Sequence, residues 1–211
     1  MIKELFSTPV YSTNINQPEF IQEIQEFILS SMTEENRIKN APQSAHNDLF
    51  ESSFDFLNWD SQITRKCKQI IIEKLMYFLR DVTNLDTKAL SKFKIYHESW
   101  FHVVKQGGYF QAHTHPNASW SVILCVNSGD VEVSNEREAG KLLFIDPRLN
   151  ASMHLDVANK DLERKYSFNG YRFRPKTGHL YIFPSFLQHS VEPYFGKEPR
   201  ITVPGNFWFH L

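Results

Sequence analysis

The chain is poor in cysteine, with only Cys67 and Cys125 among its 211 residues. Each lies inside an apolar, periodic segment, so we expect two buried, reduced thiols and no disulfide framework. The sequence also lacks an apolar run long enough for a signal peptide or for a membrane span. These absences favour a cytoplasmic protein that has no membrane partner.

A strong net charge is also lacking, because 23 Lys and Arg residues face 24 Asp and Glu residues, for a net charge of −1. A nearly neutral chain has no bulk electrostatic attraction to nucleic acid or to an anionic membrane surface, so neither is an expected partner. Aromatic residues are abundant, at 14% of the chain, and include 18 Phe. This composition favours strands and an aromatic-lined pocket.

Two segments in the first half of the chain have apolar residues at helical spacing. Residues 17–31 carry one apolar stripe, with Asn16 as the expected N-cap, and a second helix begins after Asp60 and ends near Asp81. Both are amphipathic, so we expect them to cover a sheet. Residues 33–58 between them are polar and predict a long irregular connection, to which we assign no chemistry.

The second half of the chain consists of short β-like runs separated by Gly, Asn, Asp and Pro. Such runs at short intervals predict an antiparallel sandwich or barrel, with a jelly roll as the simplest choice. We therefore expect a mainly β fold with flanking α-helices, in one domain over residues 1–211: a helical flank with an N-terminal strand over 1–90, then a jelly-roll core over 91–211. The runs are 93–104, 119–126, 131–135, 141–146, 178–184 and 201–211.

Residues 146–177 interrupt this pattern, because they lack sustained periodicity and carry many Lys and Arg residues, Arg148 among them. A long basic excursion of this kind is a candidate to fold over a pocket mouth. The alternative is a solvated loop or a decorating β-hairpin, which we expect more often for such a segment.

The most informative motif is His113-x-His115, followed at a distance by His189. Side chains two residues apart on a strand point to the same face, so His113 and His115 can bind one ion. Three imidazoles suit zinc, iron, copper or nickel and leave coordination positions open, as in a catalytic site. The two cysteines lie far from the histidines in the sequence, which disfavours a structural zinc site.

Arg200 follows His189 across a turn-like segment and opens the last apolar run. An antiparallel strand beginning there brings its guanidinium near the same cavity, and Thr202 shares its face. A guanidinium with a hydroxyl beside it is what a buried carboxylate requires, because the planar fork makes two charge-assisted hydrogen bonds. The alternative is a surface ion pair with Glu198, worth only about 0–1 kcal/mol.

These residues resemble the 2-oxoglutarate/Fe(II)-dependent dioxygenase superfamily, whose members carry H-x-D or H-x-E, a distal His, and an Arg followed two positions later by Ser or Thr. The sequence looks closest to the short 2-oxoglutarate/Fe(II) oxygenases of bacteria and phages. The resemblance covers most of the chain, in order. Its blocks are LFSTPVY at 5–11, the SW and GGYFQAHTHPNAS segments within 99–119, FIDPR at 144–148 and GHLYIFPSFLQHSVEP at 178–193.

The resemblance implies a double-stranded β-helix, or cupin-like jelly roll, in which Fe(II) is bound by His113 and His189. It implies that Arg200 and Thr202 bind the distal carboxylate of 2-oxoglutarate and that Asn206 is a candidate contact, if Pro204-Gly205 leaves the register intact. O2 is the other co-substrate, and the expected reaction gives succinate, CO2 and a hydroxylated substrate, either a small molecule or a peptide.

His115 departs from the superfamily, which has a carboxylate at this position. It remains our candidate for the third ligand, because its position is geometrically equivalent, although an all-imidazole site carries one negative charge less. His102 occupies a position where relatives tend to have Asn and is a candidate neighbour of the site. Trp100, Trp120 and Tyr109 are candidates for the substrate side of the pocket, and Arg148 for an anionic substrate group.

Two other classes of function fit the histidines. A three-histidine zinc hydratase or hydrolase would lower the pKa of bound water to about 7 but would give Arg200 no role. A non-catalytic, cupin-like metal-binding module would not turn over 2-oxoglutarate at all. The sequence gives neither the substrate nor the oligomeric state, and a homodimer is left open.

Overall fold

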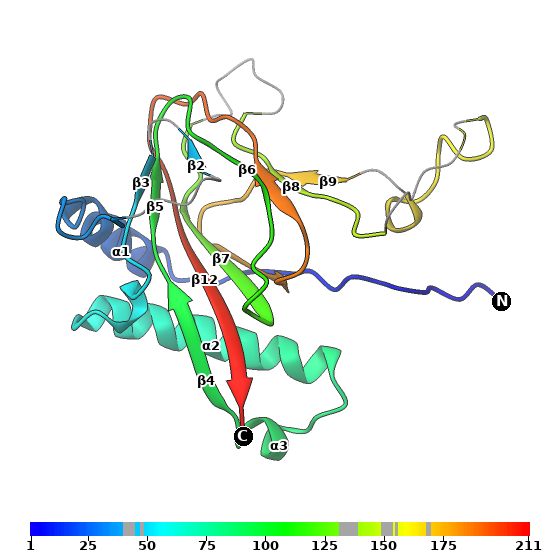
Figure 1. Ribbon diagram of the computed structural model, residues 1–211, viewed down its shortest axis with the longest axis horizontal. Helices are drawn as coiled ribbons and strands as arrows, with labels where there is room; N and C mark the ends of the chain where they lie inside the picture. The colour runs from blue at the N-terminus through cyan, green and yellow to red at the C-terminus, as the bar shows by residue number, and fades with distance from the viewer. Residues whose placement is uncertain (40–44, 47–48, 131–138, 149–153, 155, 168–169) are drawn as a thin grey trace.

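The structure is a computed structural model that describes residues 1–39, 45–46, 49–130, 139–148, 154, 156–167 and 170–211. Within these residues, two antiparallel sheets face each other and helices cover the outer side of the larger one (Figure 1). This is the jelly-roll arrangement expected from the sequence. The helices are α1 (Pro18–Ser30), α2 (Gln62–Val82), α3 (Thr87–Leu90) and the 3-10 turns η1 (Phe56–Asn58) and η3 (Arg164–Tyr166).

The larger sheet has the strand order β1-β10-β7-β12-β5-β3, with β4 also paired to β12. Its strands are β1 (Tyr11–Asn14), β3 (Leu49–Glu51), β4 (Lys94–Ser99), β5 (His102–Val104), β7 (Trp120–Asn127), β10 (His179–Pro184) and β12 (Arg200–His210). The smaller sheet has the order β2-β6-β11-β8-β9. Its strands are β2 (Ala45–His46), β6 (Tyr109–His113), β8 (Leu142–Phe144), β9 (Tyr171–Phe173) and β11 (His189–Val191).

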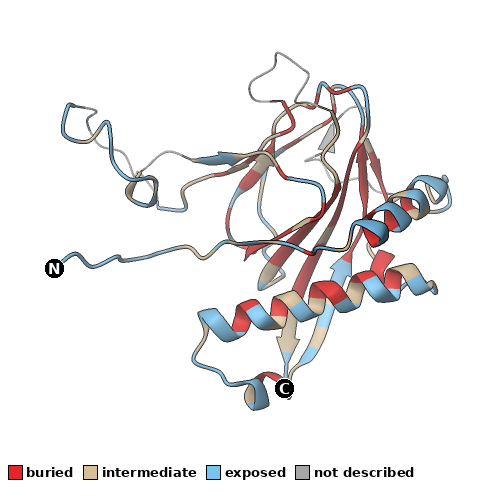
Figure 2. Cartoon of the chain, turned by 180° about the vertical axis from the view of Figure 1, so that it is seen from behind, coloured by how far each residue is buried: buried red, intermediate tan, exposed pale blue. Residues whose placement is uncertain are grey.

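Two apolar clusters hold the layers together. One joins the helices to the larger sheet, with Ile24 and Ile28 of α1 and Leu75 of α2 fully buried against strand residues such as Phe207. The other fills the space between the two sheets around Phe144 and similar side chains. Figure 2 shows the buried stripe of each helix turned toward the sheet and the exposed stripe turned to solvent. The larger sheet is therefore covered on both faces over most of its area.

The predicted helices are confirmed, but the cap of the first one is wrong. Asn16 lies in the left-handed region, at φ 52°, and Gln17 is the N-cap residue of α1, without a side-chain cap bond. In α2 the cap is regular, because the Ser61 side chain accepts a hydrogen bond from Ile63 N. Both cysteines are buried free thiols, as expected. No helix among the described residues is long and apolar enough to cross a membrane.

One further expectation needs correction, and the structure describes part of another. The segment 33–58 is not simply irregular, because it contributes β2, β3 and η1. Within 146–177, the described residues form η3 and β9. β9 pairs with β8 at the edge of the smaller sheet, whereas the residues around η3 extend away from the sheets, where Lys165 pairs with Glu4 near the N-terminus (Figure 1). The expected strand at 131–135 lies outside the described residues. The boundary at residue 90 between flank and core stays a prediction.

Candidate active site

The three predicted histidines come together between the two sheets. β6 and β11 are antiparallel neighbours, and His113 lies directly opposite His189 in their register. His115 follows two residues after His113, where its N–H donates to Ser185 O at 3.0 Å and holds the chain against the end of β10. The candidate ligand atoms of the three rings all lie within 4.8 Å of one another. This spacing suits a single metal ion.

Backbone carbonyls fix the tautomers of His113 and His189. Nδ1 of His113 lies 2.7 Å from Gln111 O, and Nδ1 of His189 lies 2.9 Å from Leu187 O. A carbonyl oxygen only accepts, so each Nδ1 carries the proton in the neutral ring and each Nε2 keeps a free lone pair. Burial lowers the pKa of His113 and lowers that of His189 to about 3. Both rings are therefore neutral near pH 7, as metal ligands must be.

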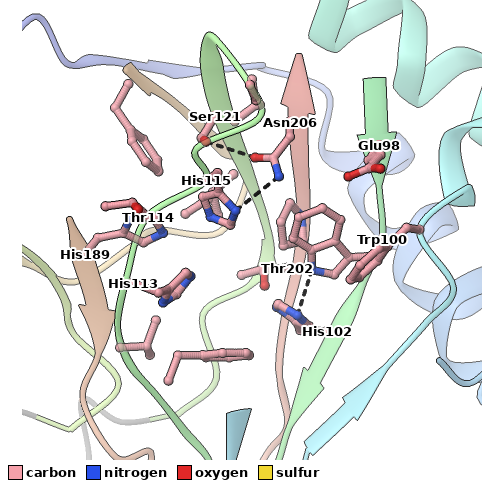
Figure 3. Close-up of a pocket in the computed structure, with 18 of the residues that line it drawn as sticks. Glu98, Trp100, His102, His113, Thr114, His115, Ser121, His189, Thr202 and Asn206 are labelled. Carbon is pink, nitrogen blue, oxygen red and sulfur yellow. Dashed lines mark hydrogen bonds between the residues drawn. The ribbon is translucent and has the colours of Figure 1, made fainter. Parts of the chain in front are cut away.

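His115 is held by a side chain of β12. Its Nδ1 lies 3.1 Å from Nδ2 of Asn206, whose Oδ1 accepts a hydrogen bond from Ser121 Oγ at 2.9 Å. Figure 3 shows this chain from His115 through Asn206 to Ser121. Ser121 Oγ in turn lies 2.9 Å from Ser185 Oγ. Burial lowers the pKa of His115 to about 4. This ring is also neutral near pH 7, and it is oriented from the opposite sheet.

Arg200 and Thr202 lie on the same face of β12 as Asn206 and line the cavity below the histidines. The register shift in β12 lies between Ile201 and Thr202, and the Pro204-Gly205 pair keeps its place opposite β7, so Asn206 remains on the cavity side. The cavity has a volume of about 430 Å³. Its walls combine these polar groups with apolar side chains, as in most small-molecule sites.

Arg200 is buried, with 3% of its surface exposed, and its guanidinium has no hydrogen-bond or ion-pair partner among the described residues. The alternative ion pair with Glu198 is not formed. Burial lowers the pKa of Arg200, and the groups that act against this shift are Cys125, Tyr194 and Tyr181, none of which is charged near pH 7. A buried cation without a counter-ion costs several kcal/mol, so this arginine indicates an anionic ligand.

The sequence analysis missed Glu51. This residue lies on β3 directly opposite His102 of β5, and its Oε2 is 2.7 Å from His102 Nε2. Trp100 Nε1 donates to the same nitrogen at 2.8 Å, and Oε1 of Glu51 is buried with no hydrogen-bond partner among the residues that the structure describes. All three side chains line the cavity. No motif pointed to Glu51, because it lies in a segment whose polar composition predicts a loop.

Most of the other residues that the sequence suggested for the pocket lie outside the cavity. Trp100 lines the cavity, but Trp120 and Tyr109 do not, and Trp120 packs edge-on against Phe78 of α2. Arg148 is also remote from the cavity and forms an ion pair with Asp146. None of the described residues of 146–177 lines the cavity. The described part of the excursion is therefore not a wall of this site.

The sequence profile of the family described as "Putative 2OG-Fe(II) oxygenase" matches residues 98–206, just over half of the chain. The chain therefore belongs to this family and is a 2-oxoglutarate/Fe(II) oxygenase. The match includes every candidate ligand and the Arg200, Thr202 and Asn206 face of β12. No curated protein matches the sequence.

Solved structures of oxygenases share the fold. A Pseudomonas putida prolyl-4-hydroxylase is 15% identical, with a TM-score of 0.61 over 97% of this chain and 94% of that chain. A Trichoplax adhaerens prolyl hydroxylase, solved with a hypoxia inducible factor peptide fragment, is 12% identical, with a TM-score of 0.59 over 94% and 83%. HygX from Streptomyces hygroscopicus, solved with nickel and 2-oxoglutarate, is 9% identical, with a TM-score of 0.60 over 95% and 83%. At these identities the likeness shows the fold alone.

Proposed function

We propose that this oxygenase couples the oxidative decarboxylation of 2-oxoglutarate to hydroxylation of a substrate C–H bond. In the balanced reaction, 2-oxoglutarate, O2 and the substrate R–H give succinate, CO2 and R–OH. His113, His115 and His189 would hold Fe(II), and Arg200 with Thr202 would bind the distal carboxylate of 2-oxoglutarate. When bound, Fe(II) supplies the redox chemistry that activates O2.

The observation that carries this proposal is the buried Arg200, which has no anionic partner in the described part of the chain and lies in the cavity that also holds three neutral imidazoles. A dicarboxylate supplies both the missing anion and, at its other end, oxygen ligands for a metal. A zinc hydratase or hydrolase would give Arg200 no role and would not explain why this arginine is buried in the cavity. A dicarboxylate co-substrate thus accounts both for the buried Arg200 and for the three imidazoles.

The protein's own residues would then bind the metal and the co-substrate, orient the ligand rings and shield the reacting centre from water. The backbone acceptors of His113 and His189 keep Nε2 free for the metal. For His115 to coordinate through Nε2, the Asn206 amide must present Oδ1 to Nδ1–H, and its Nδ2 then donates to Ser121 Oγ. Such a half-turn of the amide preserves both hydrogen bonds. The apolar walls exclude water from the reacting centre.

The experiment is a metal analysis of protein purified without oxygen, followed by an assay of succinate formation from 2-oxoglutarate. We expect about one Fe(II) per chain and Fe(II)-dependent succinate production. His113→Ala and His189→Ala should each abolish stoichiometric Fe(II) binding without unfolding the chain, which circular dichroism checks. Protein that retains zinc and gives no succinate after reconstitution with Fe(II) would contradict the proposal.

A further inference from the structure

The cavity face of the larger sheet continues beyond the candidate metal site. On β12, Asn206 is followed on the same face by Trp208 and His210, while the opposite face buries Phe207 against the helices. On β4 the residues opposite these are Glu98, Tyr96 and Lys94. Figure 1 shows β4 and the end of β12 extending past the smaller sheet, with α2 only on the far side. This part of the sheet thus has one uncovered face.

Aromatic rings occupy the uncovered face. Trp208 and Tyr96 stack across the two strands, with ring centroids 6.3 Å apart and planes at 15°, and the His210 ring meets Tyr96 edge-on at 5.1 Å. Tyr96 is 46% exposed. We call these three residues the aromatic strip. His210 is also exposed, and Trp208 is half-buried. Stacked rings that remain partly exposed are typical of a binding surface rather than of a core.

Glu98 lies where the aromatic strip meets the cavity. It is exposed, lines the cavity together with Trp208, and stands opposite Asn206, which contacts His115. Figure 3 shows its carboxylate turned toward the cavity. Among the described residues it has no cationic partner. A free carboxylate beside open aromatic faces attracts an ammonium or guanidinium group, through ion pairing and cation–π contact, and repels an anion.

We propose that the aromatic strip and Glu98 form the substrate-binding surface of this oxygenase, and that the substrate carries an ammonium or guanidinium group. The inference rests on the proposed function, because it assigns the entrance of the same site. The cationic group lies at Glu98, and the substrate body extends along the strip toward Lys94, about 13 Å away along the strand. Lys94 at the far end disfavours a second cation there and gives the substrate a direction.

Free amines and Lys or Arg side chains of peptides share this chemistry, so the test uses both. The probes are the monoamine n-butylamine, acetyl-Gly-Lys-Gly-amide and, as the opposite charge, acetyl-Gly-Glu-Gly-amide. Binding is measured by calorimetry under anaerobic conditions on the full chain loaded with Fe(II) and 2-oxoglutarate. We expect at least one cationic probe to bind and the acidic peptide not to bind; the cationic probe that binds identifies a small amine or a peptide as the source.

Three variants test the residues. Glu98→Gln keeps the shape but removes the charge and should raise the Kd of the cationic probe about fivefold or more, and Trp208→Ala should raise it several-fold. Glu73→Gln removes an exposed carboxylate on α2 and should leave the Kd unchanged. Equal binding of the cationic and acidic peptides, no binding of either cationic probe, or an unchanged Kd in Glu98→Gln would overturn the inference.

Binding of 2-oxoglutarate is measured on the same samples and separates the two proposals. If wild type binds 2-oxoglutarate but neither cationic probe, the inference about the aromatic strip fails while the proposed function stands. If wild type does not bind 2-oxoglutarate, the proposed function fails, and the inference that depends on it fails as well.

Discussion

At the scale of single residues, the site depends on which atom of each ring is free. The backbone acceptors at His113 and His189 belong to residues two positions before each histidine, so the same local geometry recurs on two strands. His115 has a side-chain partner instead, Asn206. A backbone carbonyl imposes one tautomer, whereas an amide accepts either. His115 is therefore the candidate ligand whose role most needs a test.

The first prediction concerns His115. If it holds the metal, His115→Ala should weaken Fe(II) binding by tenfold or more, because a ligand is lost. His115→Asp should keep or tighten binding, since a carboxylate adds the negative charge that the three imidazoles lack. Fe(II) affinity is measured by anaerobic competition with a chelator. Unchanged affinity in both variants would show that His115 is not a ligand.

His97 on β4 gives a prediction for acid stability. Its ring packs against Phe207, its Nδ1 is buried without a partner, and burial, with a smaller effect of Lys68, lowers its pKa to about 4. Between pH 6.5 and about 4 the unfolded chain therefore binds a proton at this residue that the folded chain does not. The free energy of unfolding should fall through this window as the pH decreases.

His97→Gln removes this titration. Urea unfolding at pH 7 and pH 4.5 should show a smaller loss of stability at pH 4.5 in His97→Gln than in wild type. The difference between the two proteins isolates His97 from the histidines of the site, whose pKa values are lowered in the same direction. Equal losses in both proteins would contradict the assignment.

How far the sequence predicts the site also differs from residue to residue. The H-x-H spacing and the distal His189 identify three rings that the structure brings together. Strand parity predicted a common face for His113 and His115, although β6 ends at His113 and the backbone bond of His115 to Ser185 places the second ring. The common cavity-facing side of Arg200 and Thr202 also follows from strand parity. Glu51 was unpredictable, because its contact with His102 depends on the pairing of β3 with β5, fifty-one residues apart in the chain. A long-range pairing leaves no local pattern.

At the scale of elements, α1 and α2 were predictable because several helical turns repeat the apolar spacing. The strands β2 and β3 were missed because two or three residues are too few to establish an alternating pattern. The cap of α1 was missed because the backbone at Asn16 adopts a left-handed conformation instead of the extended one typical of an N-cap residue, so the helix begins after Gln17. Short elements are set by their tertiary neighbours rather than by their own sequence.

One buried side-chain bond ties such a short element to the sheet. Ser99 Oγ on β4 accepts the backbone N–H of Leu57 in η1 at 3.0 Å. Ser99→Ala leaves that N–H unsatisfied and should lower the free energy of unfolding by about 1–3 kcal/mol. Ser91→Ala, at an exposed hydroxyl, is the matched control and should change it by less than about 0.5 kcal/mol. Similar unfolding midpoints for the two variants in urea would contradict this account.

At the scale of the whole molecule, the order of helices followed by strands predicted the layers, because amphipathic helices and half-buried strands have few ways to cover each other. The direction of the 146–177 excursion was not predictable, since its composition suits both a lid and a projecting loop. The cavity lies between the sheets, and each sheet contributes the polar side chains at one end of it. β6 and β11 carry histidines, and β12 carries Arg200.

The central claim is that Arg200 binds the distal carboxylate of 2-oxoglutarate, and anaerobic calorimetry with Fe(II) or Mn(II) present tests it most directly. Arg200→Ala should raise the Kd of 2-oxoglutarate by about two orders of magnitude or more, because two charge-assisted hydrogen bonds are lost. Arg200→Lys should restore binding only in part, since an ammonium lacks the planar fork. Metal affinity should barely change. If wild type does not bind 2-oxoglutarate, or if all three proteins bind it alike, the account is wrong.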